Sequence, residues 1–148
     1  MNDFIIIMKK MMSYLKIETV SFDVIMDGQK KLGLKFSPEY IKYLQEVGIY
    51  STQGCELTGI FLSKRNNRVV ESVVNETLDE RKIAKEYGYT IPNDFYLIHN
   101  LGIGGILIWQ NTKGEIYQTI RGLSSAEPPK KIYDSMNDYF IKEIYKHY

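Results

Sequence analysis

Few residues of this chain have the types and spacing that catalysis or metal binding would need. His99, His147 and the single cysteine, Cys55, are the candidates for a general base, a nucleophile or metal ligands. They lie far apart and show no spacing typical of a zinc site. A nucleophilic cysteine also needs a base and an electropositive setting, and neither is visible in the sequence. We therefore expect His99 to be structural, His147 to be solvated and Cys55 to be a small buried hydrophobic residue, with no metal and no cofactor.

A glycine-rich segment, residues 102–105, superficially resembles a phosphate-binding loop. A dinucleotide-binding fingerprint requires a strand before the glycines and a helix after them. Here the apolar run 106–109 follows, and its residues are typical of a strand. The pattern therefore favours a hairpin whose glycines supply positive φ angles in the turn.

Acidic side chains gather on one predicted helix, together with arginines and lysines. Helical spacing makes Glu76 and Glu80 neighbours and leaves Glu71 too far away to complete a site. Paired carboxylates for glycoside hydrolysis would have to face each other across a cleft from two elements. We expect a solvated helix face with ordinary ion pairs, and we predict that the protein is not an enzyme.

Aromatic residues give the one indication of function that comes from the residues themselves. Tyrosines are numerous, most of them should be core or half-buried, and the chain has one tryptophan. Exposed Tyr and Trp side chains commonly anchor protein interfaces. Our candidate partner-binding residues are Trp109, Tyr117 and Tyr50, and they point to binding rather than catalysis.

The stretch 91–118 is expected to organise the fold. Apolar runs at 95–99 and 106–109 and an alternating run at 115–120 are separated by turn residues at 100–105 and 111–114. Such runs predict a three-stranded antiparallel meander. A further strand is expected at 57–62. Polar loops are expected at 64–68 and 122–131.

Helices are predicted on both sides of this meander. Ser37, Pro38 and Glu39 form an N-terminal capping pattern for a helix that Gly48 ends. Similar patterns predict helices at 4–15, 21–32, 69–87 and from Ser135 onward. The expected fold class is α+β, with a central, mostly antiparallel β-sheet flanked by helices. We divide the chain into an N-terminal helical extension, residues 1–19, packed on its own domain, and a main domain, residues 20–148.

Composition limits the classes of partner. The chain has 148 residues, 44% hydrophobic and 25% charged, with a net charge of +1. A nearly neutral chain has no strong field for nucleic acid or an anionic membrane, so we expect neither partner. One cysteine allows no intrachain disulfide. The apolar run 4–8 is shorter than a signal peptide requires and far shorter than a membrane span of roughly 20 residues. We expect a cytoplasmic protein, either a monomer or a homodimer formed through a sheet edge or the first helix.

Taken together, five segments resemble the SUKH superfamily, the domain shared with fungal Knr-type cell-wall regulators. The run 31–44, KLGLKFSPEYIKYL, is similar to the opening motif of that family, with Pro38 slightly shifted. The other similar segments, in the order expected for the family, are 73–82, 91–98, 106–117 and 135–140. An acid that is common in the hairpin of the family is replaced here at Gln110 or Asn111.

This resemblance implies an α+β fold and a role in protein binding. Many bacterial members resemble immunity proteins, which bind and neutralise a cognate polymorphic toxin, in some cases a nuclease. The expected function is thus that of a non-enzymatic immunity protein, or antitoxin, whose partner is a toxin protein. The alternative is a regulatory or scaffold protein of the Knr type in cell-wall or stress signalling.

Overall fold

The computed structural model describes residues 3–13, 15, 17–52, 54–121 and 127–147, and of His147 the backbone alone. The expected solvation of the His147 side chain and part of the expected loop 122–131 therefore lie outside the described residues. The helices are α1 (Phe4–Met11), α2 (Phe22–Leu32), α3 (Pro38–Glu46), α4 (Ser72–Tyr87) and α5 (Met136–Tyr139), and α5 continues into a π-helical turn, Phe140–Ile144, and a 3-10 turn, Tyr145–His147. The strands are β1 (Ser51–Thr52), β2 (Cys55–Glu56), β3 (Ile60–Ser63), β4 (Arg68–Glu71), β5 (Tyr96–Asn100), β6 (Ile106–Gln110), β7 (Ile116–Ile120) and β8 (Lys130–Tyr133).

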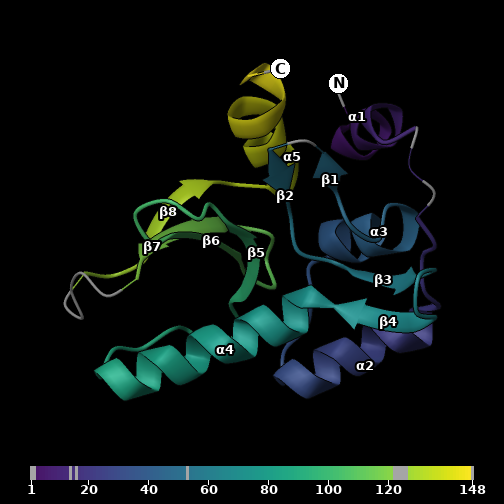
Figure 1. Cartoon of the computed structure of the whole chain (residues 1–148). Coiled ribbons are helices and arrows are strands. Elements are labelled where there is room, and N and C mark those ends of the chain that lie inside the picture. The colour runs from purple at the N-terminus through teal and green to yellow at the C-terminus, as the bar shows by residue number, and fades with distance from the viewer. Residues whose placement is uncertain (1–2, 14, 16, 53, 122–126, 148) are drawn as a thin grey trace.

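The predicted fold class is confirmed: helices surround antiparallel sheets (Figure 1). The predicted meander is present as β5, β6 and β7, and β8 extends it to four strands in the order β5-β6-β7-β8. Its register pairs Leu97 with Trp109 and Trp109 with Tyr117. Because side chains alternate along a strand, the sheet has two buried faces of different composition.

One face of the sheet belongs to the main core and the other to a smaller cluster. Ile98, Ile108 and Ile116 pack with Tyr139 and Phe140 of the C-terminal helical segment. On the opposite face, four buried residues form a separate cluster: Phe95, Leu97, Leu107 and Trp109. Buried apolar area of this kind contributes roughly 25 cal/mol per Å² to stability, so both faces hold the sheet in place.

Helix boundaries follow the capping residues where these are strong. The Ser37 hydroxyl accepts a hydrogen bond from the backbone N–H of Tyr40 at 3.1 Å, and Pro38 opens α3, as the sequence predicts. α2 ends at Gly33, whose φ of 67° is the left-handed conformation that favours glycine. Gly88 ends α4 in the same left-handed conformation.

Two segments differ from the sequence-based prediction. The helix expected at 69–87 begins at Ser72, because Arg68–Glu71 form strand β4 and pair with β3. Val69 and Val70 fit the apolar pattern of either a helix or a strand, and pairing with β3 makes this segment a strand. The first two residues of β8, Lys130 and Lys131, belong to the loop predicted at 122–131, since lysines and the preceding prolines are poor strand signals.

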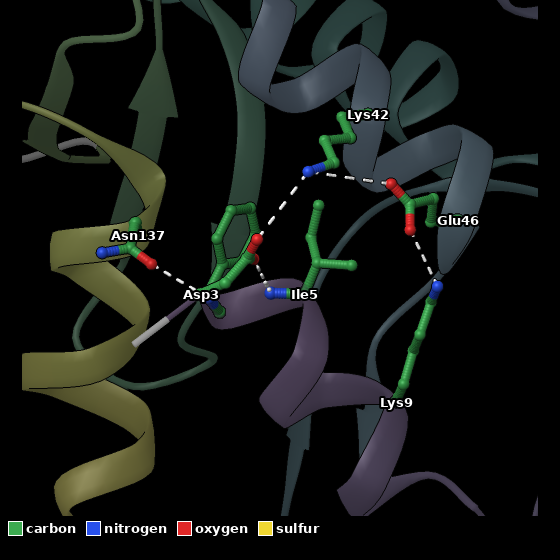
Figure 2. Close-up of polar contacts among 7 residues, drawn as sticks. Asp3, Ile5, Lys9, Lys42, Glu46 and Asn137 are labelled. Atoms are coloured by element: carbon green, nitrogen blue, oxygen red, sulfur yellow. Dashed lines mark hydrogen bonds and ion pairs between the residues drawn. The ribbon is translucent and has the colours of Figure 1, made fainter. Parts of the chain in front are cut away.

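The N-terminal helix packs on the domain, as expected, but it ends at Met11 rather than at residue 15. Phe4, Ile5 and Met8 are buried in the main core. Figure 2 shows the polar contacts that join this helix to its neighbours. The Asp3 carboxylate accepts from the N–H of Ile5 at 2.8 Å, and the Asn137 side chain accepts from the N–H of Phe4 at 2.9 Å.

Ion pairs add to the docking of α1 on α3. Lys9 lies 2.8 Å from the Glu46 carboxylate, and Lys42 lies 3.7 Å from that of Asp3 (Figure 2). Exposed pairs of this kind contribute up to about 1 kcal/mol each. Burial of the apolar face of α1 is therefore the main reason that it stays in place, and α1 is part of the core.

The outer edge of β5 is covered by other parts of the chain. The backbone N–H of Thr58 donates to the Ile98 carbonyl at 3.0 Å, and the Thr58 hydroxyl donates to the Leu97 carbonyl at 2.7 Å. On α4, the Thr77 hydroxyl accepts from the N–H of Leu97 at 2.9 Å. At the other end of the sheet, β8 is the last strand, and Figure 1 draws it at the margin of the fold.

Candidate functional site

The three aromatic residues proposed as partner anchors occupy different environments. Trp109 and Tyr50 are both 0% exposed. The Trp109 indole N–H donates to the Thr119 hydroxyl at 2.8 Å, and the Tyr50 ring packs edge-on against Phe140 at 5.1 Å. These two rings form the interior of the free chain and offer no surface to a partner.

Tyr117 differs from the other two because its side chain is only half-buried. Its ring lies 4.8 Å from that of Phe95, at the margin of the smaller apolar cluster. Of the three residues, Tyr117 alone keeps surface that a partner could touch. Partner binding by Tyr117 stays a prediction.

His99 lies on β5 and is tied to the C-terminal helical segment. Its Nδ1 shares a hydrogen bond of 2.7 Å with the Tyr139 hydroxyl. Burial lowers the pKa of His99 to about 4, so its ring is neutral near pH 7. The contact fits the structural histidine that the sequence predicts, since it joins the sheet to the helical segment that covers it.

Cys55 is half-buried on the short strand β2 rather than fully buried. Burial and, next, the neighbouring Glu56 carboxylate raise the pKa of the Cys55 thiol to about 11. Thiolates are the nucleophilic form, and the thiol is protonated at neutral pH here. The setting of Cys55 is the opposite of an activated cysteine.

The acidic face of α4 is more buried than the sequence predicts. Glu80 is 4% exposed and forms an ion pair with Arg121, whose Nε lies 3.1 Å from Oε1 of Glu80. This pair fixes α4 to the end of β7. Burial, and then the charge of Glu56, raise the pKa of Glu76. The expectation of a solvated face with helix-internal pairs is therefore wrong for Glu80.

The glycine-rich segment 102–105 is the β5–β6 turn, as the hairpin interpretation requires. Gly102, Gly104 and Gly105 have positive φ angles of 74°, 64° and 69°. Leu101 and Ile103 in the same turn are exposed. The segment reverses the chain and leads into β6 rather than into a helix.

A buried polar network, which the sequence did not reveal, joins α3, the sheet and α5. Glu39 accepts hydrogen bonds from the Gln110 side chain at 2.9 Å and from the N–H groups of Met136 and Asn137 at 2.7 and 3.0 Å. Gln110 in turn accepts from the Tyr96 hydroxyl at 2.9 Å. The carboxylate thereby satisfies the N-terminus of α5, which favours negative charge. Gln110 is therefore a structural residue.

A hollow of about 390 Å³ lies on the sheet face beneath the C-terminal helical segment. All four residues of β8 line it, together with Leu101, Ile108, Gln118, Tyr139 and Glu143. At its rim the Tyr133 hydroxyl donates to the Glu143 carboxylate, which raises the pKa of Tyr133 to about 12. Lys142 lies over the Tyr133 ring, 5.6 Å from its centre.

Most polar groups at this hollow are already bonded within the chain. His99, which bonds to the lining residue Tyr139, is uncharged. Tyr133 is hydrogen-bonded to Glu143. Lys131 is paired with Glu115 and Asp134 at 3.0 and 2.8 Å. Lys130 has no carboxylate partner among the described residues. Within that same part of the chain, no group of three or more His, Cys, Asp or Glu residues is placed to hold a metal.

Where the structure describes the chain, its helices are too short or too polar to cross a bilayer. The chain is an α+β domain with helices around an antiparallel sheet. A polar hollow lies beside its edge strand β8. The family model described as SMI1-KNR4 cell-wall, a SUKH family, matches residues 23–140. The chain belongs to this family, and the resemblance drawn from the sequence is confirmed. A comparison with curated proteins found no match.

The family match does not include α1. Its first matched residue, Asp23, lies at the start of α2, whereas α1 contributes buried residues to the same core. α1 is thus an addition to the matched segment that shares its interior.

Proposed function

We propose that this chain is a non-enzymatic immunity protein, which binds a toxin protein and blocks it by direct contact. Membership of the SMI1-KNR4 family carries the proposal, because residues 23–140 make up most of the chain. A protein that acts by occlusion needs a stable surface with apolar contacts and a polar rim.

The settings of the reactive residues support a binding role. His99 is held by Tyr139, Cys55 is kept protonated, and Glu80 is paired with Arg121. An enzyme of this size would need a base, a nucleophile or a metal at an accessible position. Each of these side chains is instead engaged in packing or in an ion pair.

The test is capture and rescue with the product of the neighbouring gene. We expect the purified chain to form a complex with that protein in size-exclusion chromatography, and to restore growth of cells that express it. Absence of both complex and rescue would refute the immunity role.

A second candidate is a regulatory or scaffold role of the Knr type, and the description of the matching family as a cell-wall family favours it. This role predicts several partners rather than one. Affinity purification of the tagged full chain from its own cells separates the two: a single stoichiometric partner supports immunity, and a set of cell-wall or signalling proteins supports regulation.

A further inference from the structure

The two outer edges of the four-stranded sheet are treated differently by the rest of the chain. β5 has its Leu97 and Ile98 backbone groups bonded to Thr58 and Thr77. Among the described residues, no strand pairs with the outer edge of β8. An open edge carries unpaired N–H and C=O groups, which are a template for another strand.

Hollows lie on both faces of the sheet beside this open edge. The hollow of about 390 Å³ shares its face with Ile108 and Gln118, which are register partners. A second hollow, of about 130 Å³, is lined by residues 118–120 of β7, by the segment 89–91 that leads from α4 into β5, and by the segment 127–130 that leads into β8. Thr119 follows Gln118 and therefore points to the opposite face, where its hydroxyl meets Trp109.

The two hollows converge on Lys130. This exposed residue begins β8, pairs in register with Gln118, and lines both hollows. Side chains of an added strand would alternate between the two faces, and each face has a hollow to receive them. Strand addition in proteins uses main-chain hydrogen bonds for affinity and such side-chain hollows for specificity.

Charge decides between the possible occupants of the edge. Lys131 is neutralised by Glu115 and Asp134, whereas Lys130 forms no ion pair within the described part of the chain, although Glu127 lines the same hollow. The β8 strand of a second copy would bring two more lysines to the edge, and the carboxylate that follows them, Asp134, is already paired with Lys131. A segment with an Asp or Glu side chain would bring the missing counter-charge, and unlike charges on adjacent strands attract.

We propose that the open edge of β8 binds an extended, acid-bearing segment of a partner protein as a fifth strand of the sheet. Its carboxylate pairs with Lys130, and its alternate side chains enter the hollows on the two faces. The inference rests on the proposed function only in taking this chain to be a binding protein, and it holds for a toxin or any other partner.

The first test uses linear peptides of about ten residues, long enough for one strand, displayed as a random library against the full chain. We expect enrichment of peptides that carry Asp or Glu among β-branched residues, and amide-exchange protection of β8 when they bind. Enrichment without an acidic residue, protection confined to other elements, or no enrichment at all would overturn the proposal.

A charge reversal tests the role of Lys130. Lys130→Glu should weaken binding of an enriched peptide by about tenfold or more, because an attraction becomes a repulsion. The matched control, Lys82→Glu, changes the net charge equally on the exposed side of α4 and should leave affinity unchanged. Equal losses in both variants would mean that only net charge matters, which contradicts the assignment.

Backbone methylation of the peptide tests pairing itself. A strand uses only one of its edges to pair with β8. Two versions of an enriched peptide, N-methylated at alternate residues on one edge or on the other, keep the same side chains. One should lose binding and the other should retain it; equal binding by both would exclude strand addition.

The failures of this inference and of the proposed function are distinguishable. If the Lys130→Glu variant still captures the toxin, strand addition at β8 is refuted and the proposed immunity role stands. Peptide binding at β8 without toxin capture or rescue refutes immunity and leaves the edge intact. A dimer of the free chain that Lys130→Glu abolishes would place a second copy on the edge, and would overturn the peptide assignment.

Discussion

The two outer strands of the four-stranded sheet, β5 and β8, both have backbone groups that no strand in the described part of the chain pairs with, and the chain treats them differently. At β5 the backbone is covered by Thr58 and Thr77, whose hydroxyl groups take the places that a neighbouring strand would supply. At β8 the chain places lysines, and no strand within the described residues pairs with the outer edge. Lysine on an edge discourages indiscriminate pairing without preventing a strand of suitable charge from binding. The comparison teaches that the covered edge serves stability and the open edge is available for recognition.

The largest expected effect lies at the covered edge, where two backbone segments nearly touch. A Cβ on Gly59 would collide with the carbonyl oxygen of Gly48, which already accepts from the N–H of Ile60 at 3.0 Å. Gly59→Ala must push the covering segment away from β5 and should cost about 3 kcal/mol or more. Urea unfolding measures the loss.

The control for this substitution is Gly102→Ala in the exposed β5–β6 turn. Its φ of 74° strains an alanine, but the space around it is open, so the cost should be about 1 kcal/mol. Equal losses for the two variants would show that close packing over the β5 edge does not set its stability.

The next effect concerns pH and the contact between His99 and Tyr139. The folded-state pKa of His99, about 4, lies below the ordinary value of 6.5, so the unfolded chain binds more protons between these limits. Stability from this residue is fully present above pH 6.5 and is lost as the pH falls toward 4. The shift corresponds to about 3 kcal/mol.

Unfolding curves across this pH range provide the measurement. His99→Gln removes the titrating group and should flatten the slope of stability between pH 4 and 6.5, whatever its effect at neutral pH. An unchanged slope in this variant would assign the pH dependence to other groups and would separate His99 from the stability of β5.

Thr58 gives a smaller effect at the same edge. Thr58→Val keeps the shape of the side chain but removes the bonds of its hydroxyl to the Leu97 carbonyl and to the Tyr40 hydroxyl, at 2.7 and 3.0 Å. Leaving buried polar groups without these bonds should cost about 2 kcal/mol. Thr90→Val, on the surface, should change the unfolding free energy by less than about 0.5 kcal/mol. Similar values for the two would mean that the Thr58 hydroxyl does not help to cover β5.

Local signals explain which parts of the fold the sequence predicts. Ser37 and Pro38 define the start of α3, because capping involves residues adjacent in the chain. β8 was missed because its lysines resemble loop residues, and pairing with β7 makes it a strand. Pairing with β3 likewise makes β4 a strand, which is why the local pattern predicts a helix for residues 69–71.

The candidate site was less predictable for the same reason. Trp109 and Tyr117 are adjacent in register, yet one is fully buried and the other half-buried, since burial depends on what covers each position. The hollows beside Lys130 are formed by segments that lie far apart in the chain. Aromatic composition does not indicate which rings face outward.

The smallest expected effect on stability comes from a substitution at the β8 edge. It gives the most direct test of the difference between the β5 and β8 edges. Lys130 is exposed and makes no ion pair among the described residues, so Lys130→Glu removes no ion pair from that part of the chain. Its unfolding free energy should stay within about 0.5 kcal/mol of that of the unaltered chain, measured by urea unfolding. Lys131→Ala, which removes exposed pairs to Glu115 and Asp134, should lose no more than about 1 kcal/mol. A large loss at Lys130 would mean that β8 serves the fold as β5 does; a small one, together with weaker peptide binding, assigns this lysine to recognition.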